Sequence, residues 1–443
     1  MKHRGRHRRR RRGRALRATL AGTALALTAT ATMISTSQAT DADDPGALKP
    51  LTASAETAPL RLTEGSVPPE WLDRLSAEMG RPVGVRAVLD DTDGSLRDAA
   101  ACPEDDRRAL PVEPAATRAY CWDGADVEGW RSGAVTTSGD ADDDGRWGPS
   151  RVVLSGWSQG GTAADGTPAE GPATAGTGPG QGLARVAFID AGDPDDLRYT
   201  WAQLAVPVDD GRDYRGLVSP VSGMVWYQDK LLVTAGRGDG SALYVYDVDR
   251  VQRATVDGAT VGRVPGGWSA AGARYVLPAV ASYRTADVNA PQPGGISLDR
   301  STAPDSLVAH EAVPKEHDGP TRLWRYAFDD DRSRAGLLAT DSVGQADVVA
   351  AYETELTDVR SVLSYGSGWY LGRMTGTPEE RGTLWRQDGK GARPTRCGAD
   401  GTHRCWSGPA ASLSYWQETG EVWSQSGRML FALPLDSVDR SLD

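Results

Sequence analysis

The chain has 443 residues, of which 39% are hydrophobic and 25% are charged, and its formal net charge is −11. Residues 1–39 hold ten Lys or Arg and no acidic residue, so removing them lowers the formal net charge to −21. This acidic balance argues against nucleic acid or an anionic membrane surface as the main partner. The length fits one large all-β repeat domain as well as several smaller domains.

Residues 1–39 have the three parts of a signal peptide. A cationic stretch ends at Arg17, an apolar stretch rich in Ala, Leu and Thr covers residues 18–34, and Ala39 closes a small-x-small cleavage site. The apolar stretch is short and weakly hydrophobic for a permanent membrane span. We therefore predict export, by the Sec or the twin-arginine route, with no stable membrane span after cleavage. An arginine-rich nucleic-acid arm and a membrane anchor are the alternatives.

Two segments precede the strand-rich part of the chain. Residues 40–66 are rich in Ala, Thr, Pro and acidic residues, which predicts a solvated linker. Residues 67–116 form a predicted N-terminal extension. In this extension, Pro69 and Glu70 favour the start of a short amphipathic helix, and residues 83–89 are expected to form a strand.

The four cysteines fall into two sequence-local pairs, Cys102 with Cys121 and Cys397 with Cys405. An even number of cysteines in an exported chain predicts disulfides, and local bridges are the simplest of the three connectivities. Zinc binding is the alternative, but neither pair has the Cys-x-x-Cys spacing that is typical of zinc sites.

Short strand signals separated by turns recur over residues 117–437. The clearest block predicts strands at residues 224–227, 231–235 and 242–248. Two later units begin near residues 359 and 412 and lie about fifty residues apart, a spacing typical of propeller blades. We therefore predict an all-β fold, a β-propeller of about five to seven blades with a short N-terminal extension that contains a helix. A β-sandwich is the alternative.

The predicted propeller resembles an uncharacterised group of exported bacterial propeller-repeat proteins. The resemblance covers roughly residues 117–437, with motifs of low specificity. It is carried by residues 223–249, by Ser412-Leu413-Ser414-Tyr415-Trp416 and by Arg428-Met429-Leu430-Phe431-Ala432. It implies a propeller and export, and it assigns no functional residue.

A Gly-x-Ser-x-Gly pattern surrounds Ser158, directly after the apolar run Val152-Val153-Leu154. In serine hydrolases this pattern forms a nucleophile elbow, which needs a helix immediately after the serine. Residues 160–182 are mostly Gly, Ala and Thr with three prolines, so a helix is not expected there. We therefore expect Ser158 in a surface loop at the end of a strand, without a catalytic role.

An acidic loop and a His/Glu cluster are candidates for metal binding. Asp140, Asp142 and Asp144 match D-x-D-x-D-G, in which alternate carboxylates can bind Ca²⁺, but the closing position of an EF-hand is occupied by Arg151. A solvated acidic loop without metal is the alternative. The His/Glu cluster lacks the second His of a zinc-protease helix, since Pro314 stands there, and predicts a polar loop. Its members are His310, Glu311, Glu316, His317 and Asp318.

These patterns favour a secreted, monomeric binding protein whose ligand is an extracellular carbohydrate or protein. The expected site is the mouth of the central channel and the loops between blades. An enzyme that acts on extracellular polysaccharide is the alternative, with carboxylates at the propeller axis as acid and base. No cofactor is expected other than Ca²⁺ at the acidic loop.

Overall fold

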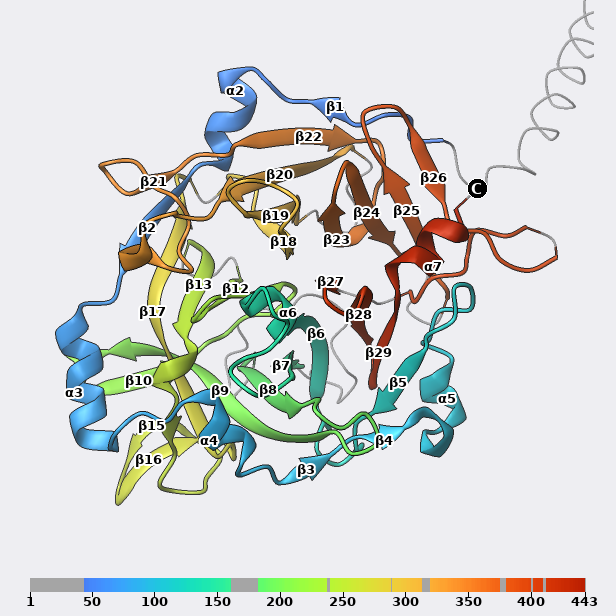
Figure 1. Cartoon of the computed structure of the whole chain (residues 1–443). Coiled ribbons are helices and arrows are strands. Elements are labelled where there is room, and N and C mark those ends of the chain that lie inside the picture. The colour runs from blue at the N-terminus through green and yellow to red at the C-terminus, as the bar shows by residue number, and fades with distance from the viewer. Residues whose placement is uncertain are drawn as a thin grey trace, which may run out of the picture. The chain divides into compact units, whose positions relative to one another are not determined.

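The strands of the chain gather in sheets arranged around one axis (Figure 1). The computed structural model describes residues 44–160, 182–236, 240–287, 289–312, 319–374, 380–399, 401–408 and 412–442. Residues 45–443 form a unit separate from residues 1–44, and the elements named here belong to it. The predicted signal peptide, residues 1–39, lies outside the described residues.

Five runs of four antiparallel strands form the blades of a β-propeller within the described ranges. Blade 1 contains β6 (Trp130–Thr137), β7 (Val152–Gln159), β8 (Ala184–Asp190) and β9 (Arg198–Val208). Blade 2 contains β11 (Met224–Tyr227), β12 (Lys230–Thr234), β13 (Ser241–Asp247) and β17 (Tyr275–Thr285). Blade 3 contains β18 (Pro293–Asp299), β19 (Ser306–Glu311), β20 (Thr321–Ala327) and β22 (Ala350–Thr354).

The last two blades complete the ring. Blade 4 contains β23 (Val359–Tyr365), β24 (Gly368–Arg373), β25 (Thr383–Gln387) and β26 (Ala392–Pro394). Blade 5 contains β27 (Ser414–Trp416), β28 (Glu421–Ser426), β29 (Met429–Pro434) and β5 (Arg118–Cys121). The prediction of an all-β propeller with about five to seven blades is therefore confirmed.

Blade 5 joins the two ends of the propeller. Three of its strands come from the C-terminal part of the chain, and the fourth, β5, pairs antiparallel with β29 in the register Met429↔Cys121. β4 (Arg97–Asp98) adds to the outside of β5. This arrangement closes the ring by backbone hydrogen bonds between β29 and β5.

Blade 2 shows why the strands have nearly continuous apolar runs. Met224 and Trp226 of β11 belong to a hydrophobic core shared with blade 1. Val225 of β11 and Leu232 of β12 belong to a core shared with blade 3. Successive strand residues point to opposite faces of a sheet. Each blade lies between two others, so both faces are buried and both sets of residues are apolar. The predicted strands of this block are confirmed.

The linker predicted for residues 40–66 is wrong for the part that the structure describes. This segment contains β1 (Lys49–Pro50), α2 (Ser54–Thr57) and β2 (Leu62–Ser66). β2 pairs antiparallel with β17, and the side chains of Leu60 and Leu62 are buried in the core between blades 2 and 3. Burial of these two leucines and the pairing of β2 with β17 order the segment despite its polar composition. An overall count of residue types does not reveal either contribution.

Two helices of the N-terminal extension, α3 (Pro69–Met79) and α4 (Val85–Leu89), bury apolar side chains against the propeller. α3 confirms the predicted helix, with Pro69 in its first turn and the positive φ of Gly80 at its end. The strand predicted for residues 83–89 is wrong, because residues Val85–Leu89 form helix α4. Val85, Val88 and Leu89 are spaced three and four residues apart and lie in the core shared with blade 1.

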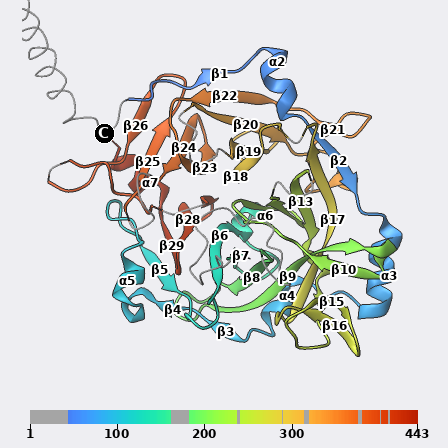
Figure 2. The same cartoon turned by 180° about the vertical axis from the view of Figure 1, so that it is seen from behind.

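Additional strands connect and extend the blades. β9 and β17 pair in parallel and join blades 1 and 2 into one sheet. The hairpin formed by β15 (Val261–Val264) and β16 (Gly267–Ala270) lies beside α3 at the outer edge of the ring, as both views show (Figure 2). The smaller elements are β3 (Gly94–Ser95), α5 (Glu104–Arg107), α6 (Ser138–Ala141), β10 (Asp213–Gly216), β14 (Gln252–Arg253), β15 (Val261–Val264), β16 (Gly267–Ala270), β21 (Gln345–Ala346) and α7 (Leu435–Arg440).

Both predicted disulfides are present. Cys102 is bonded to Cys121 and Cys397 to Cys405, so all four cysteines of the chain are paired. The first bridge ties β5, the strand that closes the ring, to the N-terminal extension. In the described residues, no helix has the length and apolar character needed to cross a membrane.

Candidate functional site

Side chains from four blades line a small pocket at one end of the propeller axis, next to α6 near the centre of the ring (Figure 1). Blade 1 contributes Asp140, blade 3 contributes Leu298 and Arg300, blade 4 contributes Ser364 and Tyr365, and blade 5 contributes Tyr415 and Gln417. Its volume is about 10 Å³. We call this cavity the axial pocket. It has room for about one water molecule.

Asp140 is the buried acidic group of the axial pocket, with 3% of its surface exposed. Its Oδ2 accepts hydrogen bonds from Thr136 Oγ1 at 2.6 Å and from Ser414 Oγ at 2.7 Å. Burial raises the pKa of the Asp140 carboxyl to about 6, because the charged form loses its hydration. The two hydroxyl groups lower that pKa, but they do not cancel the effect of burial.

The turn around Asp140 connects blades 1, 2, 3 and 5. Thr136 Oγ1 accepts a hydrogen bond from the backbone N–H of Trp226 in blade 2 at 2.9 Å. Arg300 of blade 3 donates from Nη2 to the backbone oxygen of Asp140 at 2.7 Å. Ser414, which binds the carboxylate, belongs to blade 5. The position of Asp140 therefore depends on contacts between segments far apart in the sequence.

Arg300 is the central cation of the site, and 13% of its side chain is exposed. Its guanidinium group forms an ion pair with Asp143 and lies 3.8 Å from Asp305 Oδ2. It also lies 5.7 Å from the centre of the Tyr227 ring. The Tyr227 hydroxyl donates to Asp305 Oδ2 at 3.0 Å. Burial raises the pKa of both Tyr227 and Asp305 above their usual values.

Two tyrosines from blades 4 and 5 form the opposite wall. The rings of Tyr365 and Tyr415 have their centres 4.7 Å apart and are tilted by 58°. Both side chains are half-buried. Burial, with a smaller effect from Tyr365, raises the pKa of Tyr415 to about 12. Glu418 is exposed and within electrostatic range of Tyr415, Arg300 and Asp143, so the mouth of the pocket is acidic.

A buried ion pair contacts Ser364, one of the residues that line the axial pocket. Arg325 pairs with the fully buried Asp299, and its second amino group donates to Ser364 Oγ at 2.6 Å. Asp299 also accepts from the backbone N–H of Ser301 at 2.8 Å. Ser301 Oγ in turn accepts from Gly366 N at 2.8 Å. These contacts fix the end of β18 against the end of β23, where Arg300 and Tyr365 lie.

The predicted calcium ligands point in different directions. Asp140 is buried, whereas Asp142 and Asp144 are exposed. Asp142 Oδ1 accepts from Asp144 N at 3.3 Å, and Asp144 Oδ1 accepts from Arg146 N at 2.9 Å. Over the described residues, no three His, Cys, Asp or Glu side chains are grouped in a way that could hold a metal ion. Calcium binding at this loop stays a prediction.

The other two candidate motifs do not form catalytic sites in the part of the chain that the structure describes. Ser158 lies inside β7, not in the predicted loop after it, and is buried while pairing with Ala184 of β8. His310 is buried in β19, where burial lowers its pKa to about 4 and its Nδ1 lies 3.0 Å from the oxygen of Glu311. Glu316, His317 and Asp318 lie outside the described residues.

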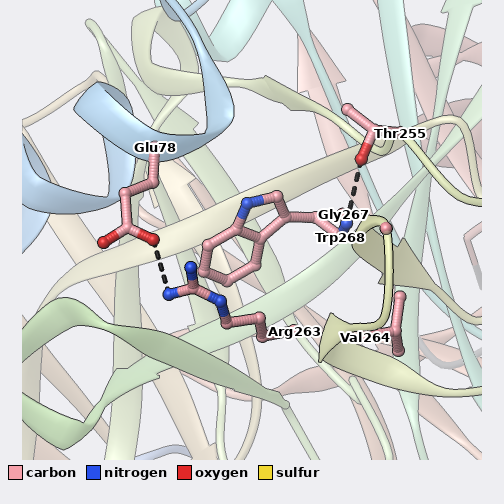
Figure 3. A pocket seen from close by; sticks show the side chains of 7 residues that line it. Glu78, Thr255, Arg263, Val264, Gly267 and Trp268 are labelled. Atoms are coloured by element: carbon pink, nitrogen blue, oxygen red, sulfur yellow. Dashed lines mark hydrogen bonds and ion pairs between the residues drawn. The ribbon is translucent and has the colours of Figure 1, made fainter.

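A larger hollow of about 560 Å³ lies at the outer edge of the ring, between α3 and the β15–β16 hairpin (Figure 3). Glu78 Oε2 and Arg263 Nη1 form an ion pair of 2.6 Å across it. The Trp268 ring is stacked on the Tyr214 ring, with their centres 5.4 Å apart. The Arg263 guanidinium also lies 5.4 Å from the centre of the Trp268 ring. Both charges of the hollow are thus paired. The axial pocket combines buried charge with contributions from several blades, so we take it as the candidate site.

Sequence reasoning missed Arg300, Tyr227, Tyr365 and Tyr415. All four lie at or next to the axial ends of the innermost strands β18, β11, β23 and β27. Aligning the blades by the end of their first strand would have brought these positions into one group. The repeats were too divergent for this alignment, so only Asp140 entered the predicted site.

Comparisons with known proteins show a distant likeness to propeller structures. No protein-family model matches the chain, and no curated protein matches it. A Drosophila plexin A structure in complex with semaphorin 1b is 9% identical, covers 74% of this chain and 88% of its own, and has a TM-score of 0.28. The PQQ domain of pyranose dehydrogenase from Coprinopsis cinerea is 10% identical and covers 68% of this chain and 92% of its own. Its TM-score is also 0.28. At these scores neither likeness carries an argument about function.

Proposed function

We propose that this protein is an exported, monomeric binding protein that captures an extracellular carbohydrate or protein at the surface around the axial pocket. The observation that carries the proposal is the composition of the pocket, since four blades each supply side chains to it. Ligand sites commonly form where separate elements converge and place a few polar groups together. Half-buried tyrosines, which offer both an apolar face and a hydroxyl, suit such a surface.

Export is supported by the sequence and by the disulfides. Residues 1–39 have the pattern of a signal peptide, and the chain resembles an exported bacterial propeller-repeat group. Both cysteine pairs are oxidised, which is typical of proteins outside the cytosol.

A polysaccharide-acting enzyme is the second candidate, favoured by the carboxylates around Arg300. Asp140, Asp143 and Asp305 all lie at this end of the axis. The size of the pocket favours binding instead, because about 10 Å³ cannot admit a sugar ring between two carboxylates. Asp140 is also held by two hydroxyl groups. Incubation with extracellular polysaccharides should therefore release no reducing ends.

The experiment that tests the proposal compares three proteins. The wild type, the double variant Tyr365→Ala/Tyr415→Ala and the control Tyr352→Ala are immobilised and exposed to purified extracellular polysaccharides and secreted proteins. Tyr352 is also half-buried, but it lies on β22, away from the axial pocket. We expect a ligand that binds the wild type and the control and loses at least about tenfold in affinity for the double variant. Equal binding by all three proteins would disprove the axial site.

A further inference from the structure

Among the described residues, the Asp140 carboxylate is held by the hydroxyl groups of Thr136 and Ser414 and forms no ion pair with a cationic side chain. Burial of a carboxylate is costly unless a cation or several donors compensate its charge. Arg300 is the nearest cation, but its guanidinium binds the backbone oxygen of Asp140 and pairs with Asp143 and Asp305. Among the described residues, no ion pair reaches the Asp140 carboxylate itself. The axial pocket therefore places a buried negative charge beside a space that could hold a cation.

The size of the space limits the cation. About 10 Å³ admits one group of the size of water, and an ammonium group has that size. A guanidinium group or a sugar ring is larger. The ε-ammonium of lysine is a compact charge at the end of a thin, flexible stem, so it can enter where an amino sugar, with its nitrogen attached to the ring, cannot.

The walls and the mouth favour the same ligand. Tyr365 and Tyr415 line the pocket, and an ammonium group is attracted to the faces of aromatic rings. Arg300 beside Tyr227 and Asp305 already shows this combination of ring, carboxylate and cation within the molecule. At the mouth, Asp143 has 90% of its side chain exposed and Glu418 is also exposed, which would attract a cation from solution.

We propose that the axial pocket receives the ammonium group of a lysine side chain from a partner protein. This inference rests on the proposed function and names its ligand class. The rings of Tyr365 and Tyr415 are in contact, with centres 4.7 Å apart, so the lysine stem would lie along their exposed edges. Its ammonium would neutralise the Asp140 carboxylate. The surrounding groups that would remain charged or polar are Arg300, Asp143, Asp305 and Glu418.

The test uses short Gly/Ser peptides that carry several lysines, with two matched probes. In one probe every lysine is Nε-acetylated, and in the other every lysine is replaced by arginine. Binding to the chain without its signal peptide is measured by titration calorimetry at neutral pH and moderate salt. We expect the acetylated and the arginine peptides to bind at least about tenfold more weakly than the lysine peptide, since acetylation removes the charge and arginine is too large.

Variants separate the pocket from the general acidity of the surface. Asp140→Asn removes the buried charge, and Gln417→Trp places a bulky group at the exposed edge of the pocket without altering a buried residue. Both should lose binding of the lysine peptide, and circular dichroism shows whether each is folded. Asp193→Asn removes an exposed carboxylate in the loop after β8 and should leave binding unchanged.

Two results would overturn the inference. One is equal binding of the lysine and acetyl-lysine peptides, and the other is equal loss of binding in Asp193→Asn and Asp140→Asn. If no lysine peptide binds while another extracellular ligand still requires Tyr365 and Tyr415, the lysine assignment fails and the proposed binding function stands. If no ligand depends on these tyrosines, both fail.

Discussion

Burial of Asp140 links the stability of the propeller to pH. The pKa of its carboxyl is about 6 in the folded chain, whereas the ordinary value is 3.8. The folded state therefore binds the proton more tightly than the unfolded state. The free energy of unfolding is therefore highest where the carboxyl is protonated and falls as pH rises from about 4 to about 6. Above about pH 6 the folded protein bears the full free-energy cost of burying the charged carboxylate, on the order of 2 to 3 kcal/mol.

The variant Asp140→Asn tests this linkage. The amide cannot ionise, so this contribution to the pH dependence should disappear. The free energy of unfolding of wild type and variant is measured by chemical denaturation at about pH 4 and about pH 7. Between these two pH values, the stability of the variant relative to the wild type should increase by on the order of 2 kcal/mol. A difference that stays constant with pH would mean that Asp140 does not titrate in this range.

Arg300 should contribute more to stability than an exposed arginine. Its side chain is mostly buried and contacts Asp140, Asp143 and Asp305, so Arg300→Met would leave carboxylates near one another without the cation between them. We expect a loss of about 2 to 3 kcal/mol in unfolding free energy, measured by urea titration. The control Arg86→Met breaks an exposed pair with Asp90 and should cost less than about 1 kcal/mol.

The acidic loop provides a third residue-scale prediction. Asp140 is engaged by two hydroxyl groups and Asp142 and Asp144 by backbone N–H groups, so the three carboxylates do not surround one point. We expect wild type and Asp142→Ala to melt with the same dependence on Ca²⁺. Even a weak extracellular-type site, with a dissociation constant of about 10⁻⁴ to 10⁻³ M, would add on the order of 1 kcal/mol at millimolar Ca²⁺. A rise in melting temperature confined to the wild type would establish the site.

At the scale of elements, β5 and its disulfide hold the ring closed. The Cys102–Cys121 bridge spans 19 residues and anchors the strand that pairs with β29. Cys397–Cys405 spans 8 residues within one local turn region. Loop-closure entropy gives about 3 kcal/mol for the longer bridge and somewhat less for the shorter one. Only the longer bridge also restrains the closing strand.

Removing each bridge separately distinguishes these roles. Cys102→Ala/Cys121→Ala should lower the unfolding free energy by about 3 kcal/mol and speed hydrogen exchange in β5 and β29. Cys397→Ala/Cys405→Ala should leave exchange in those two strands unchanged. Faster exchange of β29 in both variants would show that the closing strand does not depend on its own disulfide.

At the scale of the whole molecule, the surface and the net charge favour a monomer. Among the described residues, the large hydrophobic side chains that are exposed are Val112 and, in one segment of the chain, Val343 and Val349. Stable interfaces usually need a contiguous apolar patch, and a formal charge of −21 after loss of residues 1–39 opposes self-association. Sedimentation velocity at physiological salt should show one species with the mass of one chain, and a concentration-dependent dimer would contradict this expectation.

Local sequence determined the strands, the short helix α3 and the disulfide pairs. The short apolar runs of β11 to β13 and the closeness of Cys102 to Cys121 and of Cys397 to Cys405 are properties of short segments, so they can be predicted without knowing the rest of the chain. The same reasoning failed for β2 and α4. Their structure depends on a partner strand and a core that short-range patterns do not show.

Tertiary structure decided the site and the closure of the ring. Asp140 meets Ser414 across 274 positions of sequence, and Arg300 reaches Asp140 across 160. In the sequence Asp140 is one of five neighbouring loop residues of which four are acidic, and only the approach of four blades buries it and raises its pKa. Which strand ends converge is set by the number of blades and by the pairing of β5 with β29. Both follow from long-range packing, because the energy of burying each blade face depends on the blade beside it.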